Sequence, residues 1–170
     1  MADFVGKSFV ATLLCASEKK TGPVDFLRGG GIAGSGWLVQ GDQSGEPLQL
    51  RFGYVSHTED RFHYHISAAA SARHYAGAKL GTSANGYLGF YQVADVVDYW
   101  KLELEGENLD PSHIEFTLRD HRGHRVSATT QAMGDFWTSF RPKPLADVDF
   151  LSVDKGREVF FRARVLRYVQ

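Results

Sequence analysis

The feature that most limits the possible folds of this chain is a succession of short apolar segments, each bounded by Gly, Asp, Asn or Pro. Within them, β-branched and aromatic residues alternate with polar ones, as in strands that bury one face. About a dozen segments recur every 10 to 13 residues or so, a spacing typical of a sandwich or barrel. We predict an all-β domain with strands at Ser8–Leu14, Val24–Leu27, Gly36–Gln40, Leu48–Val55, Phe62–Ser67, Ala78–Gly81, Tyr87–Gln92, Tyr99–Leu104, Ile114–Arg119, Arg125–Thr129, Phe136–Phe140, Val148–Val153 and Val159–Tyr168.

The segments also repeat with a period of about 50 residues, which is a length typical of repeated structural units. Two sets of positions show it: Trp37, Tyr87 and Phe136, and Phe9, Phe62 and Ile114. Three such units, at about 7–58, 59–109 and 110–170, predict one β-trefoil domain, in which a six-stranded barrel is capped by three hairpins. A β-sandwich or jelly roll is the first alternative, and another β or α+β fold is the second.

Two stretches of the central unit resemble a known repeat. Asn85-Gly-Tyr-Leu-Gly and Tyr99-Trp-Lys-Leu-Glu are similar to the repeat of fascin-like and lectin-like β-trefoils. The resemblance covers about 20 residues well, and elsewhere it consists of the periodicity alone. No Gln-x-Trp occurs in the chain, so ricin-type galactose binding is not implied. The resemblance implies a binding scaffold with a sugar or a protein surface as its partner, and it transfers no site residue.

Charge and cysteine content narrow the classes of partner and compartment. The chain carries 19 basic and 20 acidic side chains, whereas a protein that binds nucleic acid usually has a basic excess. Cys15 is the one cysteine, so no intramolecular disulfide is expected. There is no apolar run of about 20 residues and no secretory signal pattern. We therefore expect no nucleic-acid partner, no transmembrane segment and a cytoplasmic protein, with export without a cleaved signal or release as alternatives. Oligomeric state stays open.

Motifs for catalysis or cofactor binding are incomplete. Gly29–Gly34 matches the Gly-x-Gly-x-x-Gly dinucleotide pattern, but a strand rather than a helix is predicted after it, so we expect a loop. No Gly-x-Ser-x-Gly elbow occurs. The His63/His65 and His121/His124 pairs have ligand spacing without an identifiable third ligand. We expect exposed histidines, no metal, no cofactor and no catalytic residue, with metal binding or pH sensing by the histidines left open.

Charged residues late in the chain alternate along predicted strands. Asp147 and Asp149 are expected on one solvent face. The arginines of the last strand region are expected on another: Arg157, Arg162, Arg164 and Arg167.

The residues that we predict for ligand binding are aromatic platforms and hydrogen-bonding groups near hairpin loops. An aromatic ring packs on the C–H face of a sugar, while carboxylates and amides orient its hydroxyl groups. The predicted set is Asn85, Tyr91, Asp95, Asp98 and Trp137. The favoured function is a non-catalytic, lectin-like carbohydrate-binding module. A toxin component or a protein- or membrane-interaction protein on the same scaffold is the alternative, and a hydrolase using His and Asp is the second.

Overall fold

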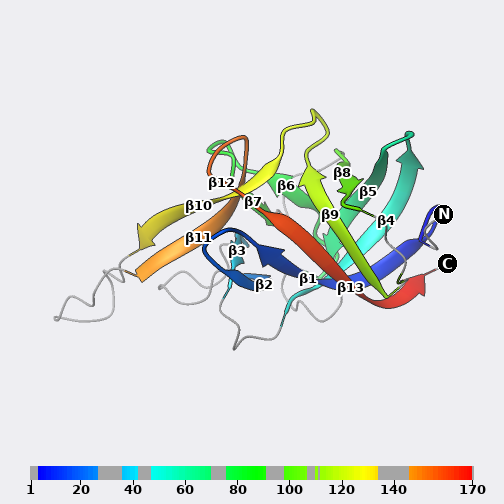
Figure 1. The fold of residues 1–170 in the computed structure, drawn as a ribbon, viewed down its shortest axis with the longest axis horizontal. Helices are drawn as coiled ribbons and strands as arrows, with labels where there is room; N and C mark the ends of the chain where they lie inside the picture. Colours follow the sequence, from blue (N-terminus) through cyan, green and yellow to red (C-terminus); the bar gives the residue numbers. More distant parts are fainter. Residues whose placement is uncertain are drawn as a thin grey trace.

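The structure is a computed structural model that describes residues 4–26, 36–41, 47–69, 76–90, 98–106, 110, 112–133 and 146–169. Within these ranges the chain forms strands and turns only, which confirms the all-β prediction (Figure 1). The strands are β1 (Ser8–Ala16), β2 (Thr21–Phe26), β3 (Leu38–Gln40), β4 (Gln49–His57), β5 (Arg61–Ala68), β6 (Leu80–Thr82), β7 (Leu88–Phe90), β8 (Trp100–Leu104), β9 (His113–Arg119), β10 (Val126–Met133), β11 (Ala146–Val153), β12 (Arg157–Glu158) and β13 (Phe160–Val169).

Six of the described strands close into an antiparallel barrel. β1 pairs with β13 along one edge and with β4 along the other. The ring continues from β13 through β9, β8 and β5 back to β4. Closure leaves the barrel without an unpaired edge strand, which would otherwise expose a row of backbone donors and acceptors.

Three hairpins among the described strands join the barrel to a second layer of pairing. They are β2–β3, β6–β7 and β10–β11. β3 and β11 meet where Val39 faces Phe150, and single bridges connect Trp37 with Gly89 and Tyr87 with Ser152. All three hairpins therefore contact one another, while β12 adds a short pairing to the outer side of β10.

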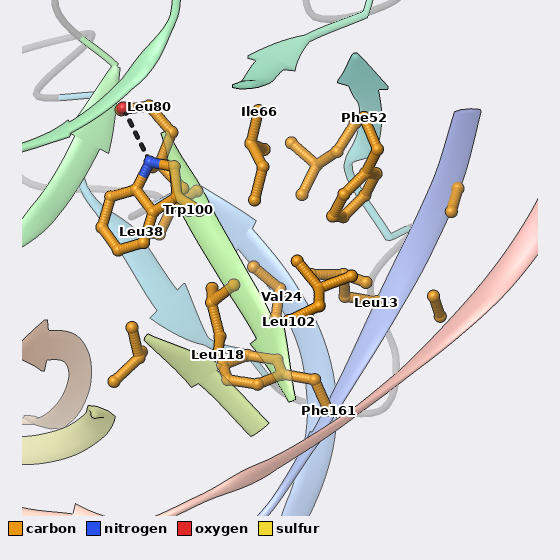
Figure 2. Close-up of a cluster of buried hydrophobic side chains, with 14 of the residues drawn as sticks. Leu13, Val24, Leu38, Phe52, Ile66, Leu80, Trp100, Leu102, Leu118 and Phe161 are labelled. Atoms are coloured by element: carbon orange, nitrogen blue, oxygen red, sulfur yellow. Dashed lines mark hydrogen bonds between the residues drawn. The ribbon is translucent and has the colours of Figure 1, made fainter. Parts of the chain in front are cut away.

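The core lies between the barrel and the hairpins. Inside the barrel, the Phe9 and Phe52 rings stack with centroids 4.7 Å apart, which joins β1 to β4 across the closing seam. The buried Trp100 on β8 donates a 3.0 Å hydrogen bond from Nε1 to the Leu80 carbonyl, which links the barrel to β6. Burial of each large apolar side chain contributes about 1.5–3 kcal/mol. Figure 2 shows part of this cluster, with Leu13, Val24, Leu38, Phe52, Ile66, Leu80, Trp100, Leu102, Leu118 and Phe161 labelled.

A second aromatic cluster joins the three hairpins. The rings of Tyr87 and Phe150 stack 4.8 Å apart, and Trp37 packs its edge against both. The third aromatic position of the 50-residue period, Phe136, lies outside the described residues, and among the described residues Phe150 on β11 supplies the third ring of this cluster. β10 and β11 pair over their whole eight-residue lengths.

The predicted strands agree with the structure wherever the structure describes them. Every predicted range from Ser8–Leu14 to Val159–Tyr168 overlaps a strand, except Phe136–Phe140, which lies outside the described residues. β12 was not predicted because its two residues are too few to show alternation.

Candidate functional site

An open groove of about 420 Å³ lies on the outer surface of the barrel, beside the start of β2. It follows β1, β13 and β9, which are neighbouring strands in the barrel (Figure 1). Its lining consists of Leu14, Ala16, Thr21, Glu105, Glu115, Phe116, Phe160, Phe161 and Arg162.

Strand alternation explains why this surface carries both apolar and charged groups. On β13, Phe160 and Arg162 are exposed, whereas Phe161 between them is buried in the core. The pairing register places Leu14 of β1 opposite Arg162, and Arg162 opposite Glu115 of β9. Directly opposed residues point to the same face, so these three side chains form one row across the groove.

The groove presents an aromatic ring beside polar groups of both charges. The Phe160 side chain is 45% exposed, and the Arg125 guanidinium lies 4.9 Å from its ring centroid. Glu105 Oε1 accepts a hydrogen bond from Thr117 Oγ1, and Glu115 Oε1 lies 3.8 Å from Arg162 Nε. Such a surface can pack a ring on an apolar ligand face and exchange hydrogen bonds with hydroxyl groups around it.

Neither of the two predicted ligand-binding residues that the structure describes, Asn85 and Asp98, lines this groove. Tyr91, Asp95 and Trp137 lie outside the described residues. Asn85 has a local structural role, because its Oδ1 accepts hydrogen bonds from Ser83 Oγ and from the Tyr87 backbone NH. These contacts shape the β6–β7 turn, on which Asn85 is exposed.

Asp98, the remaining predicted residue, lies before β8 at a different place on the barrel. Its exposed carboxylate is 3.7 Å from His121 Nδ1 on the β9–β10 turn. Neither Asn85 nor Asp98 contributes to the groove lining. The signal that could have indicated the groove is the alternation of Phe160 and Arg162, which the sequence suggested only as a solvent face.

The predicted histidine pairs belong to separate surroundings. His63 Nδ1 lies 3.0 Å from Ser56 Oγ, and the His63 ring stacks on the Tyr99 ring with their centroids 4.6 Å apart. Burial, followed by the charge of Lys101, lowers the pKa of His63, which favours the neutral ring. The His124 ring lies instead beside Asp120, with Nδ1 3.3 Å from Asp120 Oδ2. Within the described ranges, no three side chains of the metal-binding types gather closely enough to hold an ion.

The prediction that Asp147 and Asp149 share one solvent face is wrong for Asp149. Asp147 is exposed, but Asp149 is buried, and Lys20 Nζ and Arg157 Nη2 each approach its carboxylate to 2.7 Å. Thr130 Oγ1 donates a further hydrogen bond of 2.5 Å. Burial alone would raise the pKa of Asp149, but these hydrogen bonds outweigh it and lower the pKa to about 2.

This ion cluster leads to a prediction about pH. Because the pKa is lowered on folding, the ionised Asp149 stabilises the protein above about pH 4, and this contribution disappears as pH falls towards 2. The Asp149→Asn variant should lose about 2 kcal/mol at pH 7, less than for a fully buried pair because Lys20 and Arg157 are partly exposed. Urea unfolding of both proteins at pH 7, 4 and 2.5 should show the difference narrowing at low pH. A constant difference would contradict this assignment.

The C-terminal arginines divide into two groups. Arg162, Arg164 and Arg167 are exposed on β13, as predicted. Arg157 does not share this solvent face, because its guanidinium is held by Asp149.

Comparison of the chain with protein-family models, curated protein sequences and solved structures finds no match. In the described part of the chain there is no helix with the length and apolar character to cross a membrane.

Proposed function

We propose that this protein is a non-catalytic, lectin-like carbohydrate-binding module on a β-trefoil scaffold, with its sugar site in the groove on β1, β13 and β9. The observation that carries the proposal is the exposed ring of Phe160 beside Glu105, Glu115 and Arg162 in one groove. This combination of one aromatic surface with several hydrogen-bonding groups suits the apolar and polar faces of a sugar ring.

The order of the described strands supports the trefoil scaffold. Each third of the chain contributes two barrel strands with one hairpin between them along the sequence. The first third supplies β1 and β4 around β2–β3, and the second supplies β5 and β8 around β6–β7. The last supplies β9 and β13 around β10–β11. On this proposal the three thirds are the units expected at 7–58, 59–109 and 110–170.

The groove favours a neutral sugar. Its volume of about 420 Å³ is within the range of roughly 300–1,000 Å³ usual for small-molecule sites. The lining contains two carboxylates, Glu105 and Glu115, and one guanidinium group, that of Arg162. Carboxylate oxygens accept hydrogen bonds from hydroxyl groups, whereas an acidic sugar would meet like charge.

The interaction-protein alternative uses the same surface in another way. Leu14 is 42% exposed and adjoins Phe160 in the groove, so both could anchor a protein or a membrane surface. A free sugar that competes for the groove distinguishes the two functions, because it would displace a bound glycan but leave an apolar anchor in place.

A glycan-array screen of the purified protein tests the proposal, with Phe160→Ala as the site variant and Val55→Ala as the control. Val55 is also an exposed apolar residue, 41% accessible, but it lies on β4 outside the groove. We expect selective binding of neutral glycans, weakened about tenfold or more by Phe160→Ala because the stacking surface is lost. We expect no change from Val55→Ala.

Two results would contradict the proposal. One is a folded protein that binds none of the glycans. The other is glycan binding that Phe160→Ala leaves unchanged, which would place the sugar elsewhere on the molecule. Circular dichroism of each variant establishes that the fold is retained.

A further inference from the structure

Beyond the groove, the barrel carries a row of arginines that the sugar site does not use. Arg51 on β4 pairs with Val10 on β1, and Val10 pairs with Arg167 on β13. Thr12, two residues further along β1, pairs with Arg164. All three arginines are exposed, and we call Arg51, Arg164 and Arg167 the arginine wall.

The packing of neighbouring residues into the core shows which way the arginine side chains of the wall point. Phe9 and Phe52 stack inside the barrel, so alternation directs their neighbours Val10 and Arg51 to the outer face, where Arg51 is exposed but Val10 is only 2% exposed. On β13 a bulge follows Val165, because Ala11 pairs with Val165 but Val10 pairs with Arg167. A bulge of this kind re-aims the side chains after it. Here it lets Arg164 and Arg167 both face solvent although they are three residues apart.

The wall concentrates positive charge on one face of the barrel. Within the described part of the chain, none of its three guanidinium groups has a carboxylate within 4 Å. Lys7 adds a further positive charge nearby, with Nζ 5.4 Å from the Tyr168 ring centroid. This is notable in a protein whose net charge is −1.

The spacing of the guanidinium groups suits a ligand with repeated negative charges. Arg51 and Arg167 are two strands apart, and Arg164 and Arg167 are three residues apart along β13, so each pair is separated by about 10 Å at the backbone. Guanidinium groups bind the oxygens of sulfate and carboxylate groups through paired hydrogen bonds.

The position of the wall beside the groove identifies the class of ligand. The row of Leu14, Arg162 and Glu115 in the groove is the next outward row after Thr12 and Arg164. We infer that the arginine wall binds an anionic polysaccharide, with sulfate or carboxylate groups, that lies along β13 beside the groove and does not enter it. The choice of a polysaccharide rests on the proposed carbohydrate-binding function.

The surroundings of the wall favour a polysaccharide over a nucleic acid. Nonspecific binding of single strands relies on aromatic side chains that stack on bases. Tyr168, the aromatic residue beside Arg167, is 37% exposed, but Lys7 lies over its ring and the ring also packs against Phe9. The wall itself consists of three arginines, which offer no aromatic ring on which bases could stack.

Binding to dextran sulfate, with uncharged dextran as the reference, tests the inference. The site variant is Arg51→Gln/Arg164→Gln/Arg167→Gln. The control, Lys19→Gln/Lys79→Gln/Arg122→Gln, changes the net charge equally at exposed positions outside the wall. We expect the wild type to prefer dextran sulfate to dextran. The site variant should lose about tenfold or more in affinity and depend less steeply on salt, whereas the control should stay within about twofold.

Two results would overturn the inference. One is an affinity for dextran sulfate that the site variant does not change, and the other is binding of duplex DNA as tightly as dextran sulfate at equal charge concentration.

The Phe160→Ala variant distinguishes a failure of this inference from a failure of the proposed function. If it abolishes neutral-glycan binding while dextran sulfate binding persists, both stand. If neutral glycans do not bind at all and the site variant still loses dextran sulfate, the groove proposal fails and the wall remains.

Discussion

Replacement of Phe52 by alanine is expected to lower the free energy of unfolding by about 3–5 kcal/mol. The Phe52 side chain is fully buried at the seam between β4 and β1. Besides stacking on Phe9, its ring contacts Tyr64 of β5 and Phe116 of β9, with centroids 6.0 and 6.4 Å away. The truncation therefore removes contacts to three other barrel strands at once and leaves a cavity where the ring of strands closes.

Urea unfolding at neutral pH measures this loss, with Val55→Ala as the control on the same strand. Because Val55 is exposed, its truncation should change stability by less than about 0.5 kcal/mol. If Phe52→Ala does not fold, Phe52→Leu should retain the fold with a smaller loss of about 1–2 kcal/mol. Equal stability of Phe52→Ala and Val55→Ala would show that β4 does not close the barrel as described.

A comparably large loss, about 2–4 kcal/mol, is expected for Gly156→Ala. Gly156 lies between β11 and β12 with φ of +100°, a backbone conformation that disfavours other residues. A Cβ at this position would also overlap the backbone carbonyl of Ala128 on β10. Since neither the turn nor the central backbone of a paired strand can shift easily, the substitution should disrupt the β10–β12 pairing.

The Gly6→Ala variant separates the cost of the positive φ from the cost of the steric overlap. Gly6 also has a positive φ, +75°, but a Cβ there would meet no atom within 4 Å. This control should therefore lose only the conformational part, about 1–2 kcal/mol. Thermal unfolding of both variants measures the difference, and equal losses would mean that Gly156 is not tightly enclosed by β10.

The sequence was most informative where a local pattern determines the structure. Alternation located the strands, and in a strand it requires that neighbouring side chains such as Tyr99 and Trp100 point to opposite faces. The structure places Trp100 in the core and Tyr99 partly exposed on His63. Phe9, Phe62 and Ile114, which the period grouped by their spacing, lie on the barrel strands β1, β5 and β9.

The features that could not be predicted depend on contacts between distant segments. Asp149 shows the same alternation as an exposed residue, and only the approach of Lys20, from another part of the chain, makes it a buried ion pair. The groove likewise requires the register that aligns Leu14 with Arg162, which no local pattern specifies. Alternation predicted that Arg162 is exposed, but not which side chains lie beside it.

The most direct test of the proposed sugar site is an NMR titration of the isotopically labelled protein with the neutral glycan that binds best on the array. We expect the amide signals of Leu14, Thr21, Glu115 and Arg162 to shift together and saturably, because their side chains line one groove. The Phe160→Ala variant should show these shifts only at about tenfold higher glycan concentration or more. Shifts confined to the turns around Asn85 and Asp98, with the groove signals unchanged, would contradict the proposed site and return it to the surface first predicted from the sequence.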